Sequence, residues 1–158
     1  MKFFLRERTE DDIEDFLSWT YDGIYSFYDN SIQQEKIDGF RESVHKEREL
    51  SVVNEFSELV GNCEFFDVSD EDEEEILAVG IQMKPSLTGN GLGSAFFHAI
   101  VEQGKSLFGY KHLELAVVDF NHRAIKVYER EGSQQIGEFM NEIRGESYRF
   151  IIMAKDWY

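Results

Sequence analysis

The chain is poor in residues that cross-link or break a polypeptide, with one cysteine and one proline among 158 residues. Because a single thiol cannot form an internal disulfide, the sequence does not fit the disulfide-rich class of small secreted domains. It also lacks an apolar run near the roughly 20 residues that a membrane-spanning helix requires, and charge interrupts its first segment too early for a secretory signal. We therefore expect a cytoplasmic protein in which Cys63, inside an apolar alternating segment, is a buried and unreactive thiol.

Basic residues are scarce as well: 16 Lys and Arg face 32 Asp and Glu, which gives a net charge of −16. Such a field repels nucleic acid and anionic membrane surfaces and attracts cationic partners, unless the charge serves solubility alone. Residues 69–75 concentrate the acid and predict either a solvated turn between strands or a site that attracts a polyamine or basic peptide. The four histidines, at positions 45, 98, 112 and 122, lack the spacing of metal ligands, so no metal is predicted.

The composition is that of a packed globular protein, with 42% hydrophobic and 15% aromatic residues, and we expect one domain over residues 1–158. Thr9 and Asp12 form a capping box that starts a first helix, with Ile13 and Phe16 on its apolar face. The remaining patterns predict helices near residues 33–47, 92–108 and 121–131, and strands near residues 2–7, 50–56, 59–68, 76–83, 113–118, 134–140 and 147–154. Because this order mixes hairpins with crossovers, it predicts an α/β fold with a mixed sheet and helices on both faces.

The glycine-rich segment Gly89–Ser94 is the most informative feature, because it joins a predicted strand to a predicted helix. Main-chain amides of such a turn converge where the helix dipole is positive, and phosphate is the usual ligand there. A Rossmann fingerprint needs G-x-G-x-x-G, whereas this chain has G-x-G-x-G-S. The segment Gly104-Lys105-Ser106 is similar to the end of a Walker A motif, but Ala99 replaces the required glycine. A plain connecting turn is the remaining alternative.

Two segments carry spacings that point to a family. Residues 88–93 have the spacing T-x-x-G-x-G, and residues 121–132 have the spacing N-x-x-A-x-x-x-Y-x-x-x-G. Together they resemble the GCN5-related N-acetyltransferase (GNAT) family, whose acetyl-CoA motif is Q/R-x-x-G-x-G/A, with Thr88 where Gln or Arg is expected. The resemblance covers residues 76–154 well. It implies a central, mostly antiparallel sheet of about seven strands with helices on both faces.

The resemblance also implies how acetyl-CoA is held. In this family the strand before the glycine loop diverges from its neighbour, so backbone groups of Ile81 and Met83 would pair with the pantetheine arm and the loop amides would hold the pyrophosphate. Thr88 offers one hydroxyl where Arg would offer a charged fork. Candidates for the missing charge are Lys84, Arg123 and Lys126. The implied cofactor-binding residues are Ile81, Met83, Thr88, Gly89, Asn90, Gly91, Leu92, Gly93, Ser94, Asn121 and Tyr128.

The implied reaction moves acetyl from acetyl-CoA to a primary amine by direct transfer in a ternary complex. Tyr128 occupies the family's general-acid position, two helical turns after the Asn121 cap, and would protonate the departing thiolate. Its spacing from Ala124 also fits an aromatic on the buried face of the helix. Candidates for the general base, by location only, are Glu64, Glu75 and Gln82, with a water chain as the alternative.

Residues 19–28 form an aromatic segment without helical or strand period, and the segment lies where the family builds its acceptor pocket. Its rings, together with Asp22 and Asp29, would suit a cationic amine. The alternative is that the rings pack as core. The negative field favours a cationic acceptor, namely an aminoglycoside-like molecule, a polyamine, or a peptide or protein amine. Thr88 and the missing base leave a second function open, a CoA-binding regulatory or interaction module without transfer. Edge strands near the C-terminus allow a homodimer.

Overall fold

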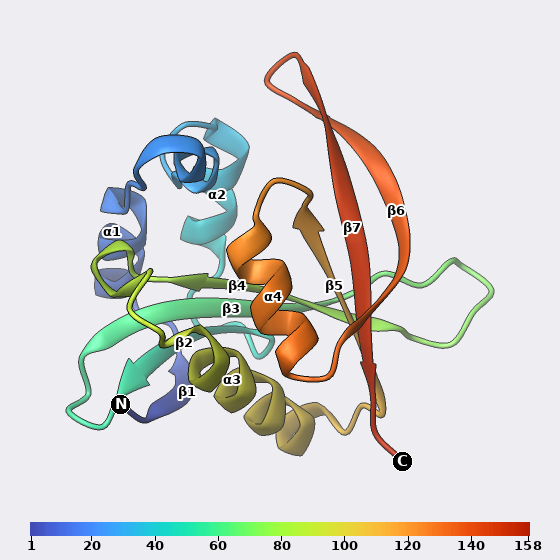
Figure 1. The fold of residues 1–158 in the computed structure, drawn as a ribbon. Coiled ribbons are helices and arrows are strands. Elements are labelled where there is room, and N and C mark those ends of the chain that lie inside the picture. Colours follow the sequence, from blue (N-terminus) through green and yellow to red (C-terminus); the bar gives the residue numbers. More distant parts are fainter.

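Seven strands form one mixed sheet, in the order β1-β2-β3-β4-β5-β7-β6 (Figure 1). The computed structural model describes residues 1–158, and every neighbouring pair of strands is antiparallel except β4 and β5, which are parallel. The strands are β1 (Phe3–Glu7), β2 (Glu49–Asn54), β3 (Leu59–Asp67), β4 (Leu77–Met83), β5 (His112–Val118), β6 (Gln134–Ile143) and β7 (Glu146–Asp156). The predicted mixed and mostly antiparallel seven-stranded sheet is confirmed.

Helices cover both faces of this sheet, as predicted (Figure 1). α3 buries Phe96, Phe97 and Ile100 in the main core, whereas α1 buries Ile13 and Phe16 in a separate, smaller cluster. No helix combines the length and the apolar character that crossing a bilayer requires. The helices are α1 (Glu10–Ser18), α2 (Gln34–Glu42), α3 (Gly93–Phe108) and α4 (His122–Arg130), with two short 3₁₀ helices, η1 (Gly23–Tyr28) and η2 (Pro85–Leu87).

The start of α1 and the environment of the cysteine both agree with the sequence patterns. The Asp12 amide donates to the Thr9 hydroxyl (3.3 Å), and the Asp12 carboxylate accepts from the Thr9 amide (3.0 Å), so the predicted capping box is present. Cys63 is fully buried in β3, and burial raises the pKa of its thiol to about 12. The predicted burial of the cysteine is confirmed, and a thiol that stays protonated is a poor nucleophile.

The second helix ends earlier than predicted, at Glu42 and not near residue 47. Ser43 explains the difference, because its buried hydroxyl donates to the Phe40 carbonyl (2.6 Å) and competes with helical hydrogen bonding. His45 then adopts a left-handed conformation with a φ of 61°, which a continuing right-handed helix does not allow. The prediction of a longer helix was wrong at this end, since apolar spacing alone does not report a side chain that caps the chain locally.

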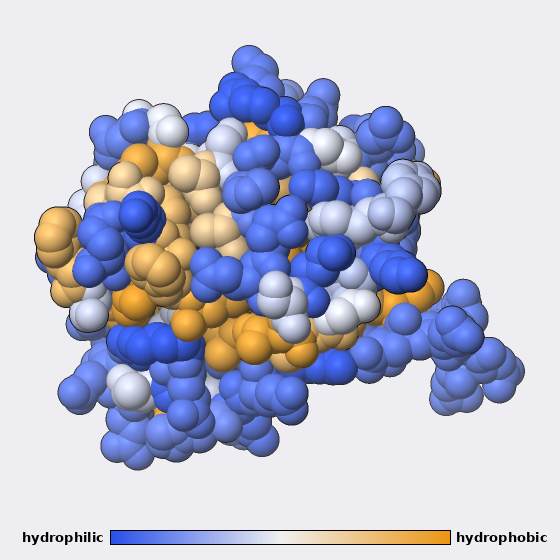
Figure 2. All heavy atoms as spheres, turned by 90° about the horizontal axis from the view of Figure 1, so that it is seen from below, coloured by the Kyte–Doolittle hydropathy of each residue, from blue (hydrophilic) through white to orange (hydrophobic).

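The acidic run forms an exposed turn between β3 and β4, and it is the hydrophilic projection at the right of Figure 2. Asp67 closes the base of the turn, because its carboxylate accepts from the Ser69 hydroxyl (2.6 Å) and from the Ile76 amide (3.2 Å). Glu75 pairs at the surface with Arg48 (3.0 Å). The predicted turn between strands is confirmed.

The sheet opens between β4 and β5. These strands pair only at Leu77–Leu113 and Ala78–Glu114, although β4 remains paired with β3 as far as Met83 and β5 remains paired with β7 as far as Val118. Beyond the short parallel ladder, the facing edges of the two strands have no strand partner. Such edges can pair with an extended ligand that carries amide groups, and this opening positions the candidate site.

Candidate active site

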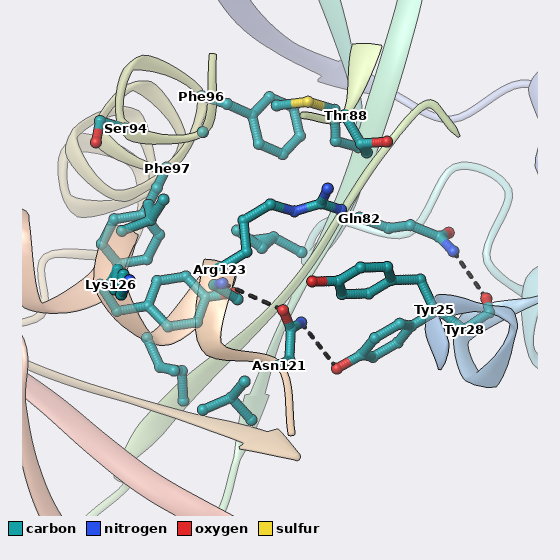
Figure 3. Close-up of a pocket in the computed structure, with 18 of the residues that line it drawn as sticks. Tyr25, Tyr28, Gln82, Thr88, Ser94, Phe96, Phe97, Asn121, Arg123 and Lys126 are labelled. Carbon is teal, nitrogen blue, oxygen red and sulfur yellow. Dashed lines mark hydrogen bonds between the residues drawn. The ribbon is translucent and has the colours of Figure 1, made fainter. Parts of the chain in front are cut away.

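A cavity of about 660 Å³ occupies the opening between β4 and β5 (Figure 3). Its walls come from both strands, from the glycine loop with the first turn of α3, from α4 and from η1. Every predicted cofactor contact except Asn90 and Leu92 lines it, namely Ile81, Met83, Thr88, Gly89, Gly91, Gly93, Ser94, Asn121 and Tyr128. The structure therefore brings together residues that lie in three separate segments of the sequence.

The glycine loop presents unpaired amides at the start of α3. Gly89 and Gly91 have φ angles of 74° and 75°, a conformation that a β-carbon disfavours. The first backbone hydrogen bond of α3 is donated by the Phe96 amide to the Leu92 carbonyl (3.0 Å), so the amides before it donate to no main-chain acceptor within the helix. Free amides and the positive end of a 16-residue helix suit an anion.

The side chains of three other loop residues make contacts within the protein. The Thr88 hydroxyl donates to the Pro85 carbonyl (2.7 Å), which turns it toward its own chain. The Asn90 side chain donates to the Ser86 and Thr88 carbonyls (3.4 and 3.2 Å) and so braces the loop from outside the cavity. Leu92 packs against the main core. Of these three, only Thr88 lines the cavity.

Cationic side chains from α4 stand beside the loop. Arg123 lies over the Tyr25 ring, with its guanidinium carbon 4.2 Å from the ring centroid, and its Nη1 would be 3.4 Å from a β-carbon built on Gly89 (Figure 3). Arg130 donates from Nη1 to the Ser94 hydroxyl (3.2 Å). Lys126 also lines the cavity, whereas Lys84 does not. The missing charge at position 88 thus has neighbours that could replace it.

Arg130 was not among the sequence candidates, although a signal for it was present. It follows Arg123 by seven residues on one helix, a spacing that places both on the same face. The aromatic contact of Arg123 could not be read in this way, because Tyr25 comes from a distant segment.

Tyr128 lies in the cavity wall, and both sequence interpretations of it have structural support. Its ring packs against Phe97 at a centroid separation of 4.8 Å, as a buried aromatic would. Its hydroxyl has no hydrogen-bond partner in the protein, and burial raises the pKa of Tyr128, so the group stays protonated at neutral pH. A buried hydroxyl of this kind can donate a proton to a ligand atom beside it.

Asn121 joins α4 to the aromatic segment. Its side-chain oxygen accepts from the Ala124 amide (3.2 Å), which confirms the predicted helix cap, and its Nδ2 donates to the Tyr28 hydroxyl (3.0 Å, Figure 3). Burial raises the pKa of Tyr28 to about 12. Because Tyr28 only accepts in this bond, its proton is free to be donated into the cavity. Sequence reasoning singled out no role for Tyr28.

The aromatic segment divides between pocket and core. Three tyrosines line the cavity, namely Tyr21, Tyr25 and Tyr28. Trp19 instead packs against Phe16 in the small cluster around α1. Asp22 and Asp29 do not line the cavity, and Asp29 accepts a hydrogen bond from the Tyr21 amide (2.7 Å). Only part of the segment therefore has the position that the sequence suggested.

The three candidates for the base occupy different places. Gln82 uses its amide group fully: its oxygen accepts from Asn30 (2.8 Å) and Asn62 (3.0 Å), and its nitrogen donates to the Tyr28 carbonyl (3.1 Å). Glu75 is held by Arg48 at the surface. Glu64 faces a second cavity next to β4, with a pKa that burial raises.

Comparison with known proteins identifies the family. Residues 2–134 match the sequence profile described as the acetyltransferase (GNAT) domain, which is well over half of the chain. The chain belongs to the GNAT family of acetyltransferases. No curated protein sequence matches it significantly.

Solved structures of GNAT proteins share this fold over nearly the whole chain. An acetyltransferase of the family from Bacillus anthracis has 18% identity and a TM-score of 0.76, with 99% of this chain and 95% of that chain covered. One from Streptococcus pneumoniae has 14% identity and a TM-score of 0.65, with 98% and 99% covered. The spermidine N-acetyltransferase from Vibrio cholerae, solved with CoA and spermine, has 16% identity and a TM-score of 0.68, with 97% and 94% covered. At these identities the likeness shows the fold.

Proposed function

We propose that this GNAT acetyltransferase moves the acetyl group of acetyl-CoA to a primary amine, by direct transfer while both substrates are bound. The observation that carries the proposal is the opening between β4 and β5, which leaves unpaired strand edges next to a loop of free amides. Few ligands need an extended amide-bearing arm and a diphosphate at adjacent places, and CoA has both.

The residues of the cavity fit CoA in charge as well as in shape. Unpaired backbone on β4 near Ile81 faces the place of the pantetheine arm, and the amides of residues 89–94 would hold the pyrophosphate. Arg123, Lys126 and Arg130 supply positive charge on one side of that loop, in a protein with a net charge of −16. We propose that Arg123 compensates for the uncharged Thr88.

Tyr128 is the proposed proton donor to the thiolate that leaves. Its hydroxyl is protonated, has no partner in the protein and lines the cavity, and these are the properties that a general acid needs. Asn121 orients the neighbouring Tyr28 hydroxyl, which is a second protonated group in the same wall. Acetyl-CoA supplies the reactive thioester when it is bound, and the chain contributes position, charge and protons.

The test combines calorimetry with an assay of thiol release. We expect saturable binding of CoA and acetyl-CoA, and release of free thiol when a primary amine is added. A panel that starts with polyamines and aminoglycosides covers the cationic acceptors that the acidic composition favours. Absence of any CoA binding by the folded protein would overturn the proposal. Binding of CoA without thiol release from any amine would instead identify a CoA-binding module.

Three broader expectations belong to this proposal. Residues 1–158 act as one N-acetyltransferase domain, which is supported by a single sheet whose strands run from Phe3 to Asp156. The protein acts in the cytoplasm on a small-molecule or peptide amine. It forms a homodimer through the edge strand β6, where Ile136 and Met140 are 56% and 62% exposed. Sedimentation at several protein concentrations tests the dimer.

A further inference from the structure

A second cavity of about 340 Å³ adjoins the first across β4. The two cavities share four lining residues, Tyr28, Gly80, Ile81 and Gln82, so they meet along the middle of this strand. The second cavity is otherwise lined by residues of β2, β3, α2 and the segment before α1, and by Asn30 between η1 and α2. None of these residues belongs to the glycine loop or to α4, so they are not part of the proposed CoA site.

Two carboxylates stand side by side in the second cavity. Glu49 of β2 is directly opposite Glu64 of β3 in the antiparallel register, so their β-carbons are about 5 Å apart on one face of the sheet. Like charges in this position destabilise a sheet unless a cation lies between them. Neither carboxylate takes part in any ion pair of the protein.

The two cations that line the same cavity are already engaged. Arg8 is buried and donates to the Leu50 carbonyl, the Ser43 hydroxyl and the Cys63 carbonyl, at 2.9 to 3.2 Å. Lys36 donates to the Tyr28 carbonyl (3.2 Å). Both cations donate to neutral groups, so neither glutamate has a direct ion pair, although Arg8 and Lys36 lie near Glu64.

Gly80 leaves the β4 backbone uncovered next to the Glu64 carboxylate. It is paired with Glu64 across β3 and β4, and a β-carbon built on Gly80 would lie 3.2 Å from Glu64 Oε1. The Glu64 carboxylate therefore lies over a stretch of β4 backbone that carries no side chain and lines both cavities. A nitrogen held by Glu64 would be next to the part of β4 that lines both cavities.

We propose that the second cavity binds the amine acceptor as an alkylammonium ion, with Glu64 holding its nitrogen beside Gly80 and Glu49 favouring a second ammonium group on the same molecule. This inference rests on the proposed acetyl transfer. It assigns acceptor recognition to Glu64 and Glu49, in place of the Asp22 and Asp29 that the sequence suggested.

The proton changes of the reaction then balance. The ammonium loses one proton to the Glu64 carboxylate, and the neutral nitrogen forms a C–N bond to the acetyl carbon while the C–S bond breaks. The nitrogen passes its second proton to the tyrosine hydroxyls of the first cavity, and these hydroxyls deliver one proton to the sulfur that leaves. Glu64 returns its proton to solvent through the second cavity, which the Glu64 side chain lines.

Three amines with the same carbon chain test the charge preference: cadaverine, pentylamine and δ-aminovalerate. We expect kcat/KM for thiol release to fall in that order, because δ-aminovalerate brings a carboxylate to a cavity that already holds two.

Glu64→Gln should lower kcat/KM for cadaverine by about tenfold or more, since a charged hydrogen bond is lost. Glu49→Gln should reduce the difference between cadaverine and pentylamine. Glu10→Gln changes an exposed glutamate outside both cavities, so it is the matched control and should leave all three values unchanged.

A pH profile separates recognition by Glu64 from a merely structural role. Burial raises the pKa of Glu64, with Glu49 adding to the rise and with Arg8 and Lys36 opposing it. Wild-type kcat/KM should therefore fall as the pH drops through this raised value, and Glu64→Gln should lose that limb while its CoA affinity and its thermal midpoint stay unchanged.

The outcomes separate the two proposals. Unchanged kcat/KM and an unchanged pH limb in Glu64→Gln would overturn the acceptor site but leave acetyl transfer intact. A preference for δ-aminovalerate over cadaverine would do the same. No thiol release from any amine, despite CoA binding, would overturn the proposed function and this inference with it.

Discussion

The two cavities beside β4 are built in different ways. Many of the residues that line the first lie in two continuous motifs, the glycine loop with the start of α3, and α4 with its cap. The second is lined by residues of β2, β3, α2 and the segment before α1, and by Asn30, which all come from separate parts of the sequence. A site made of neighbouring backbone amides can be recognised as a local sequence motif. A site made of side chains from distant segments can be recognised only when the register of the strands is known.

The cavities also differ in charge. Arg123, Lys126 and Arg130 give the first three cationic side chains, whereas the second brings Glu49 and Glu64 together without a direct ion pair. The net charge of −16 describes neither of them. An anionic donor and a cationic acceptor are thereby drawn to opposite sides of one strand, where only backbone separates them.

The strongest test of the first cavity is Tyr128→Phe. We expect kcat for acetyl transfer to fall by about a hundredfold, because a general acid contributes a factor of this order or more and a thiolate is already a good leaving group. CoA affinity should be unchanged, since the ring still packs against Phe97. Stopped-flow or steady-state thiol release gives the rate, and calorimetry gives the affinity.

Tyr148→Phe is the matched control for that change. Tyr148 also carries a hydroxyl on an aromatic ring, but it bonds to Glu146 at the surface and lies outside both cavities. Loss of the Tyr148 hydroxyl should leave kcat at the wild-type value. Full activity in Tyr128→Phe would remove Tyr128 from the chemistry and leave it as a packing residue, with Tyr28 as the remaining protonated hydroxyl of the wall.

Arg123→Ala tests whether a helix replaces the charge that the loop lacks. We expect the Kd for CoA to rise by about tenfold, because one hydrogen bond to a charged group is lost beside the loop. Lys84→Ala is the comparison, because Lys84 is exposed and lies outside the cavity. Calorimetry that found the same loss of affinity for both variants would show that the long-range field, and not the position of Arg123, matters.

The sequence predicted the fold where the determinants are local. The capping box of α1, the strand that contains Cys63 and the glycine loop each depend on a few neighbouring residues, and each formed as expected. The end of α2 could not be predicted, because Ser43 is held by Arg8, which is 35 positions away. Its partner appears only when the strands have assembled.

The candidate site shows the same difference between local and long-range determinants. The residues of the two motifs lie around one cavity, as their spacing predicted, although their contacts with CoA remain a prediction. Tyr28 could not be chosen, since its bond to Asn121 spans 93 positions. Glu64 was one of three candidates until the register placed it over Gly80. Distances between side chains from different strands are set by topology, which composition and periodicity do not encode.

His112 lies at the end of β5 that pairs with β4, and its substitution should change stability without affecting either cavity. Hydrogen bonds to Glu114 (2.7 Å) and Asp156 (2.6 Å) raise the pKa of His112. Its contribution to stability is therefore complete below the unfolded pKa of about 6.5 and is lost as the pH rises through the higher folded value. We expect His112→Gln to lower Tm by up to about 2 °C at low pH and not at high pH, because exposed ion pairs contribute little. Calorimetric scans check this, and a change in CoA affinity would contradict the separation.

The smallest effect should come from the acidic residues of the aromatic segment. Asp22→Asn combined with Asp29→Asn removes two negative charges near η1, yet we expect KM for cadaverine to stay within about twofold, because salt screens the exposed Asp22 and the Asp29 carboxylate already accepts from the Tyr21 amide. Neither residue lines a cavity, and Asn at position 29 can still accept from the Tyr21 amide. Steady-state kinetics of the double variant and of Glu64→Gln, measured under the same conditions, give the comparison. If the double variant raised KM as much as Glu64→Gln, the acceptor would be recognised by the aromatic segment, and the second cavity would lose its role.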